Sequence, residues 1–196
     1  SNGPHLAVIA NEKRDYLIDL IDMNGDRETI ELGSMSRAPD TVMAVDADQD
    51  SKTDLLLFTR DKPMIMLHAS VPEDGGDERF EKMEKDDMGQ FGLVAKAASD
   101  NTTVFDIDGD AQAELLIADS NHVRAVRYEA QPTDGSSPGW QVVKQINMDD
   151  PTAELVAVAA EGPRIVAADK PGNRLVIFEA DQSGDWRQAE TLTLNG

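Results

Sequence analysis

The sequence predicts an all-β protein, a β-propeller of four-stranded antiparallel blades with about four blades present in its 196 residues. Three observations lead to this prediction. Apolar runs that start at Leu6, Leu56, Leu116 and Ile165 recur at intervals of 50, 60 and 49 residues. Each run belongs to a unit of short apolar, β-branched segments separated by Gly, Asp, Asn and Pro, which is typical of strands and tight turns. Within each unit the last segment is the most polar.

The repeat divides a single propeller-type domain, residues 1–196, into approximate units at 4–39, 40–98, 99–150 and 151–196. We name the four predicted strands of a complete unit a, b, c and d. The first unit begins in strand b, so the chain contains three whole units and about three quarters of another. Two arrangements remain open: a fragment of a larger propeller, or a four-bladed ring in which one sheet is short by a strand.

The inner strands of each unit are the apolar ones. Strand a is predicted at residues 42–45, 103–105 and 155–158, and strand b at 6–10, 56–60, 116–120 and 165–169. Strand c is predicted at residues 16–18, 64–67, 123–126 and 174–178. Because strands covered on both faces read as continuous apolar runs, we expect strands a and b to be buried on both faces.

The outer strand d is predicted to face water. It follows turns at residues 24–26, 74–77, 134–137 and 182–185, and in three units it opens with an aromatic residue, namely Phe80, Trp140 and Trp186. We expect Trp140 and Trp186 to pack the outer strand rather than to form a sugar-stacking platform. Residues 78–85 are rich in Arg, Glu and Lys, as in a helix, but their place in the repeat favours strand d.

The charge and composition exclude several functional classes. Thirty-eight acidic residues against 18 Lys and Arg give a formal net charge of −20. Such a surface repels phosphate backbones, so we expect no nucleic-acid partner. No apolar run approaches the roughly 20 residues of a membrane helix, so no membrane insertion is expected. Since the chain has no cysteine, it has no disulfide, zinc–thiolate site or cysteine nucleophile.

Two acidic segments between strands a and b predict metal binding. They run over residues 46–54 and 106–114, and both have carboxylates at positions 1, 3, 5 and 9. Calcium takes six to eight oxygen ligands, and position 7 of such loops usually adds a backbone carbonyl oxygen. Magnesium demands octahedral geometry and is therefore the less suitable ion. We therefore predict two Ca²⁺ sites, although ordinary acidic turns are the alternative. The predicted ligands are Asp46, Asp48, Asp50, Lys52 and Asp54 in the first site, and Asp106, Asp108, Asp110, Gln112 and Glu114 in the second.

These residues resemble the FG-GAP and VCBS repeats of integrin α-subunit propellers and many secreted bacterial proteins. The family's calcium loop runs Asp-x-Asp-x-Asp-Gly-x-x-Asp-Leu; both segments match its acidic positions, with Glu114-Leu115 closing the second, and Phe91-Gly92 precedes it. Ser51 and Ala111 replace the family's Gly at position 6, where Gly suits a left-handed backbone. The resemblance implies a secreted, periplasmic or cell-surface protein.

The expected function is a noncatalytic calcium-binding propeller module for extracellular recognition or adhesion, or a structural spacer, with an unknown protein or carbohydrate ligand. The alternative is part of a propeller enzyme, of polysaccharide lyase or quinoprotein type, with its active site largely outside this chain. His5, His68 and His122 occupy unrelated repeat positions, so we expect surface or loop histidines. A pocket joining His68 or His122 to an arginine and a carboxylate would favour the enzyme. Residues 22–26 are expected to form a hairpin turn.

Overall fold

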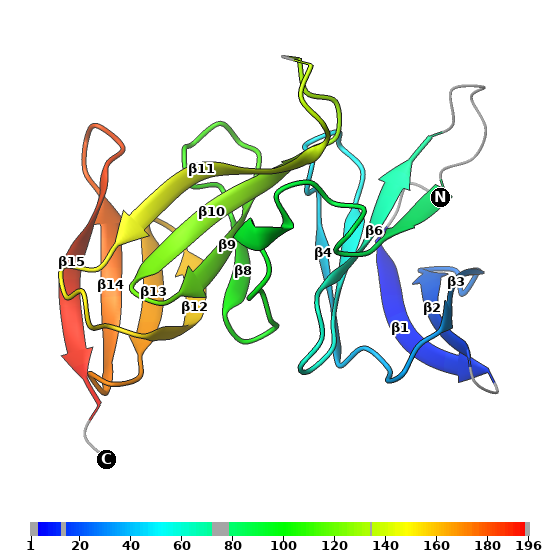
Figure 1. The fold of residues 1–196 in the computed structure, drawn as a ribbon, viewed down its shortest axis with the longest axis horizontal. Helices are drawn as coiled ribbons and strands as arrows, with labels where there is room; N and C mark the ends of the chain where they lie inside the picture. Colours follow the sequence, from blue (N-terminus) through cyan, green and yellow to red (C-terminus); the bar gives the residue numbers. More distant parts are fainter. Residues whose placement is uncertain (1–3, 13–14, 72–78, 134, 195–196) are drawn as a thin grey trace.

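The computed structural model describes residues 4–12, 15–71, 79–133 and 135–194. Its strands form four antiparallel sheets that follow one another in a row (Figure 1). In each sheet the strand order follows the sequence, so every sheet is an up-and-down meander. This arrangement confirms the predicted all-β fold of propeller-type blades. The predicted turn at residues 74–77 lies outside the described residues, as does residue 134 of the turn at 134–137.

The first sheet has three strands and the other three sheets have four each. The first sheet consists of β1 (His5–Glu12), β2 (Asp15–Asp22) and β3 (Arg27–Ser34). The second consists of β4 (Thr41–Val45), β5 (Asp54–Phe58), β6 (Ile65–Ser70) and β7 (Arg79–Met83). The third consists of β8 (Thr102–Phe105), β9 (Glu114–Asp119), β10 (His122–Glu129) and β11 (Gly139–Asn147). The fourth consists of β12 (Leu155–Glu161), β13 (Arg164–Asp169), β14 (Arg174–Ala180) and β15 (Trp186–Thr193), and a short 3-10 turn, η1 (Phe91–Leu93), precedes the third sheet.

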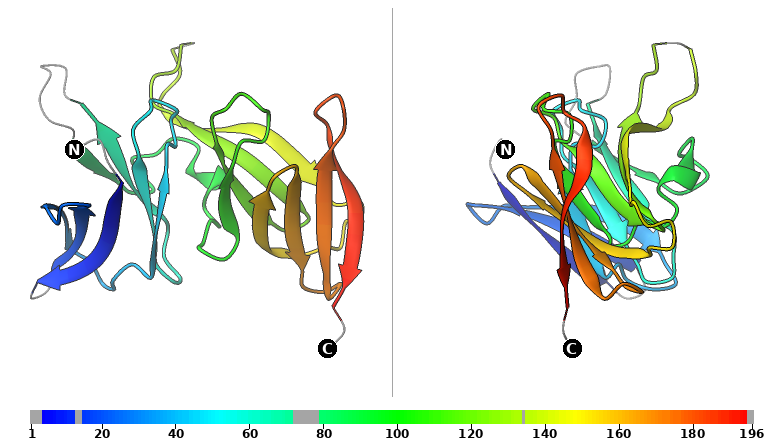
Figure 2. Two further views of the ribbon diagram at one scale, coloured as in Figure 1. Left: turned by 180° about the vertical axis from the view of Figure 1, so that it is seen from behind. Right: turned by 90° about the vertical axis from the view of Figure 1, so that its left-hand side faces the viewer.

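The first and last sheets lie at opposite ends of the row (Figures 1 and 2). The described residues therefore form an open array of blades, and the four-bladed ring is not formed. In the described part of the chain, no helix is long and apolar enough to cross a membrane.

Three hydrophobic cores lie between neighbouring sheets, and strand b explains why they are separate. In β5, Leu55 and Leu57 pack toward the first sheet, while Leu56 and Phe58 pack toward the third. Successive side chains of a strand point to opposite faces, so a strand between two cores needs an apolar residue at every position. All five residues of β5 are buried, as are the first five of β9, which confirms two-sided burial for these strands.

The other inner strands are only partly buried and so differ from the prediction, and β4 and β1 show why. Strand a is only partly buried: β4 has one buried residue, Val45, and Ala44 is exposed. The reason is that β4 is the edge strand of its sheet, with β5 as its single hydrogen-bonded neighbour. In β1, Ala7 and Ile9 pack toward the second sheet, whereas Leu6 and Val8 are exposed. The outer face of β1 has no neighbouring sheet, because the first sheet ends the row.

The outer-strand tryptophans pack as predicted. Trp140, the second residue of β11, is completely buried and lies edge-on to Tyr128. Trp186, the first residue of β15, lies edge-on to Phe105 and is half-buried. Neither ring is an exposed platform for a sugar. The Asn24-Gly25 segment is a hairpin turn between β2 and β3, as predicted, with Gly25 N–H bonded to the Asp22 carbonyl at 3.1 Å.

Candidate metal centre

Two acidic loops occupy equivalent places in neighbouring sheets. Loop 1, residues 46–54, joins β4 to β5, and loop 2, residues 106–114, joins β8 to β9. Each loop starts directly after strand a and ends on the first residue of strand b. The flanking residues pair across the sheet, Val45 with Asp54 and Phe105 with Glu114. Strand pairing therefore brings positions 1 and 9 of each loop together, as a compact ion site requires.

Loop 1 is folded by hydrogen bonds from its own backbone to its carboxylates. Asp46 at position 1 accepts from the N–H groups of Asp50 at 3.0 Å and Ser51 at 2.9 Å. Asp50 at position 5 accepts from the Lys52 N–H at 2.9 Å, and the Lys52 ammonium also bonds to Asp50. The position 1 carboxylate thus stabilises the turn by accepting hydrogen bonds from the N–H groups of positions 5 and 6.

Loop 2 repeats this pattern with different residues. Asp106 at position 1 accepts from the N–H groups of Gly109 at 2.7 Å and Ala111 at 2.9 Å. Asp110 at position 5 accepts from the Gln112 N–H at 2.8 Å. In both loops the position 6 N–H bonds to the position 1 carboxylate, so the common spacing produces a common local fold.

The backbone is left-handed at positions 4 and 6 of both loops. At position 6, φ is 69° for Ser51 and 70° for Ala111; at position 4, it is 61° for Gln49 and 83° for Gly109. The structure therefore supplies the reason that a Gly is expected at position 6. A left-handed φ costs about 1–2 kcal/mol for a residue with a Cβ atom. Ser51 and Ala111 bear this cost.

We expect Ala111→Gly to stabilise the protein by roughly 0.5–1 kcal/mol, because relief of the left-handed strain exceeds the added entropy of the unfolded chain. Ala113→Gly is the matched control. Ala113 lies in the same loop outside the left-handed region. That variant should lose at least about 0.4–1 kcal/mol, since the entropy of the unfolded chain rises and a half-buried methyl group is removed. Denaturant unfolding in chelator measures both, and equal effects of the two substitutions would contradict the strain at position 6.

The position 9 carboxylates are buried and anchor the loops to the sheets. Asp54 is 1 % exposed and accepts from the N–H groups of Ala47 at 2.9 Å and Ala69 at 2.8 Å. Glu114 is also 1 % exposed and accepts from the Ile107 N–H at 3.1 Å. In each loop the position 9 carboxylate thus bonds to the N–H of position 2. The longer Glu side chain makes the same contact as Asp.

Most of the predicted ligands come together. Ligand atoms of Asp46, Asp48 and Asp50 lie within 4.8 Å of one another, and so do those of Asp106, Asp108 and Glu114. Asp54 groups with Asp48 and with a residue that the prediction omitted, His68. Asp110 is outside the loop 2 group and instead accepts from Gln112. The backbone carbonyls of residues 52 and 112 remain predicted ligands. Both loops therefore have acidic groups able to hold a metal ion.

Three carboxylates of the two loops, those of Asp46, Asp48 and Glu114, resist ionisation without a cation. Burial raises the pKa of Asp46 and Asp48, and the nearby charges of Asp50 and Asp54 raise both further. Burial likewise raises the pKa of Glu114, with added repulsion from the three aspartates of loop 2. A divalent cation would relieve this repulsion and favour the ionised form.

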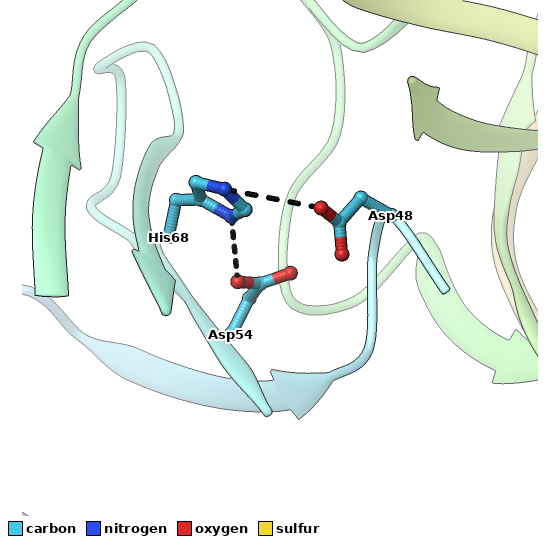
Figure 3. A group of neighbouring side chains, drawn as sticks. All are labelled: Asp48, Asp54 and His68. Carbon is cyan, nitrogen blue, oxygen red and sulfur yellow. Dashed lines mark hydrogen bonds and ion pairs between the residues drawn. The ribbon is translucent and has the colours of Figure 1, made fainter. Parts of the chain in front are cut away.

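The prediction that His68 is a surface or loop histidine is wrong. It lies in β6, its side chain is 13 % exposed, and its Nδ1 is 3.0 Å from Asp54 Oδ1 (Figure 3). Its Nε2 is 3.8 Å from Asp48 Oδ2. The hydrogen bond to Asp54 raises the pKa of His68. Comparing the repeat positions of the three histidines missed this contact, because it comes from the pairing of β5 with β6. Aligning strand b with strand c of the same unit would have placed His68 beside Asp54.

Each loop also docks onto the next sheet. The carbonyl of Ala47, at position 2 of loop 1, accepts from the Tyr128 N–H of β10 at 2.7 Å. The carbonyl of Ile107, at position 2 of loop 2, accepts from the Trp186 indole of β15 at 3.0 Å. The two loops are joined directly as well, since Gln49 Nε2 donates to Glu114 Oε1 at 3.0 Å. The loops therefore form part of the contacts between blades.

A cavity of about 540 Å³ opens beside loop 1, between the second and third sheets. Polar and charged side chains dominate its lining. Among the lining residues are Asp48, Lys52, His68, Gln112, Arg127 and Tyr128. Arg127 Nη1 donates to Gln49 Oε1 at 3.3 Å, which links the cavity wall to loop 1.

No protein-family model matches the chain. No curated protein matches it either. Among solved structures, the chain is similar to a protein from Lactobacillus plantarum whose crystal structure was determined as a structural genomics target, with 15% sequence identity and a TM-score of 0.44. The similarity covers 95% of this chain and 53% of that one, so the chain spans about half the length of that protein.

Proposed function

We propose that the chain is a calcium-binding β-propeller module without catalytic activity, of the FG-GAP or VCBS type. The observation that carries this proposal is the equivalence of the two loops. Both join strand a to strand b, and both fold around a position 1 carboxylate with a left-handed residue at position 6. Acidic turns that arose only for solubility have no reason to share this geometry.

Calcium is the cation that suits these loops best. Carboxylate oxygens are hard ligands, and calcium accepts six to eight of them in flexible geometry. Magnesium keeps several waters and needs octahedral geometry, which loops built from several carboxylates do not favour. A bound ion would remove the repulsion that raises the pKa values of Asp46, Asp48 and Glu114.

The proposed role of calcium is to hold neighbouring blades together. Loop 1 bonds to β10 through Ala47, and loop 2 bonds to Trp186 of β15 through Ile107. An ordered loop keeps its position 2 carbonyl in place for this contact. An ion in each loop would therefore stiffen the row of blades, which suits a recognition or adhesion surface or a spacer.

Isothermal titration of calcium into chelator-treated protein tests the proposal. We expect two calcium ions per chain for the wild type and one for each of the variants Asp46→Asn and Asp106→Asn, because each loses a position 1 ligand. Asp26→Asn, in the hairpin turn after β2, is the matched control and should bind two. Binding of calcium by neither loop would exclude the proposed function.

The proposed setting is secreted, periplasmic or on the cell surface, where calcium is abundant enough for loops of modest affinity. This setting follows from the family resemblance of the loops. The proposed partner, besides calcium, is a protein or a carbohydrate. The net charge of −20 argues against nucleic acid as that partner.

A propeller enzyme is the second candidate, and one observation favours it. His68, a carboxylate at 3.0 Å from it, and Arg127 line or border the same cavity. This is the combination that an acid–base site on a charged polysaccharide would need. Depolymerisation of a uronate-containing polysaccharide by the wild type, lost in Arg127→Gln, would favour the enzyme over the binding module.

A further inference from the structure

We propose that His68 and Asp48 form a binding site for a borderline transition metal such as Zn²⁺, oriented by Asp54, so that loop 1 differs from loop 2 in metal preference. The inference deepens the proposed function, because it rests on loop 1 being a metal site. Figure 3 shows the arrangement: the imidazole of His68 lies between the two carboxylates, with one ring nitrogen toward each.

The hydrogen bonds determine which ring nitrogen is available. Asp54 Oδ1 accepts from the Ala69 N–H at 2.8 Å and lies 3.0 Å from His68 Nδ1. Where Asp54 is the acceptor of this bond, Nδ1 carries the hydrogen. In the neutral form of this tautomer, the Nε2 lone pair lies toward Asp48. A ligating histidine typically has this arrangement, with its other N–H held by a carboxylate.

The spacing fits one shared ion. Zinc binds histidine nitrogen and carboxylate oxygen at about 2.0–2.2 Å, so two such ligands of a tetrahedral ion lie roughly 3.3–3.6 Å apart. His68 Nε2 and Asp48 Oδ2 are 3.8 Å apart, so a side-chain movement of a few tenths of an ångström would bring both onto one ion. Both side chains are largely buried, 13 % and 6 % exposed, and both line the 540 Å³ cavity, from which water can complete the coordination.

Strand register shows why loop 2 lacks this site. Leu67 of β6 pairs with Leu55, and Val126 of β10 pairs with Leu115. His68 and Arg127 therefore occupy equivalent positions, each one residue beyond these pairs. Arginine stays protonated and has no lone pair to offer a metal. Imidazole favours zinc, copper and nickel, whereas an all-oxygen site favours calcium and magnesium. The fold thus places a nitrogen ligand beside loop 1 alone of the two loops.

Titration of Zn²⁺ and of Co²⁺, a spectroscopic substitute, into chelator-treated protein tests this inference. We expect His68→Gln and His68→Arg to weaken zinc binding at least tenfold and to abolish the visible absorption of nitrogen-ligated cobalt. His68→Arg installs the residue that the equivalent position of β10 already accommodates. His122→Gln, in another strand c, is the matched control and should change neither. Thermal melting in chelator confirms that each variant is folded.

Calcium titration of the same samples separates this inference from the proposed function. We expect both His68 variants to bind calcium within about threefold of the wild type, because loop 1 keeps its carboxylates. Zinc affinity that is equal in the wild type and both folded variants, or no zinc binding by the wild type, would overturn the inference and leave the calcium proposal standing. His68-dependent zinc binding without any calcium binding would support the inference and overturn the calcium proposal.

Discussion

Calcium is expected to raise the melting temperature of the wild-type protein by about 5–10 °C for each occupied loop. A ligand that binds only the folded state stabilises it by about 2.7 kcal/mol at 100 times its dissociation constant. In a domain of this size, 1 kcal/mol shifts the melting temperature by roughly 2–4 °C. Asp48→Asn should remove the increment of loop 1, and Asp108→Asn that of loop 2. Differential scanning calorimetry in chelator and in excess calcium measures these increments.

The same Asp48→Asn variant should have the opposite effect in chelator, where it is expected to melt higher than the wild type. Burial and the charges of Asp50 and Asp54 raise the pKa of Asp48, so its ionisation destabilises the folded state. Protonated Asp48 contributes to the free energy of unfolding below its ordinary pKa of about 3.8, and this contribution is lost as the pH rises through the raised pKa. The advantage of the variant should therefore be absent near pH 3.5, grow with pH and level off above the raised pKa.

Two outcomes would contradict this account. Coincident wild-type melting curves in chelator and in calcium would mean that the loops are ordinary acidic turns. An Asp48→Asn variant that melts below the wild type in chelator would mean that repulsion among the loop 1 carboxylates is negligible. Asp26→Asn, in the β2–β3 turn, controls for the general effect of removing one negative charge from a protein of net charge −20.

Asp54→Ala is expected to destabilise the protein by about 2–5 kcal/mol even in chelator, a fall of roughly 4–20 °C in melting temperature. The substitution leaves two backbone N–H groups without their acceptor, those of Ala47 and Ala69, and removes the partner of the His68 ring; each orphaned buried donor costs about 1–3 kcal/mol. Denaturant unfolding in chelator measures the loss. Asp54 therefore differs from Asp48, whose neutralisation in chelator should stabilise.

Glu114→Ala in loop 2 is the matched comparison for Asp54→Ala. Glu114 accepts one backbone N–H, that of Ile107, and its other bond is to the Gln49 side chain, which can turn elsewhere. The expected loss is therefore smaller than for Asp54→Ala. Asp54→Asn should be intermediate, because the amide keeps one acceptor oxygen. A loss for Glu114→Ala equal to or above that for Asp54→Ala would contradict the role of two backbone donors.

Local features of this protein could be predicted from the sequence. The apolar run of β5 indicates a strand buried on both faces, because alternate side chains must satisfy two cores. The acidic spacing indicates the loop fold, because position 1 bonds to an N–H only five residues away, as Asp46 does to Ser51. The missing Gly at position 6 also pointed to a backbone constraint, which the positive φ of Ser51 and Ala111 explains.

Contacts across strands and sheets were decided only by the tertiary structure. His68 meets Asp54 because β6 pairs with β5 in one register, and Gln49 meets Glu114 across 65 residues because two sheets pack together. The exposure of Leu6 and Ala44 likewise depends on which strands lie at an edge of a sheet or at the end of the open row. A loop is determined by hydrogen bonds among residues close in sequence. Strand register and sheet packing depend instead on the apolar area that many residues bury together. The identity of one side chain therefore does not indicate which distant residue it will contact.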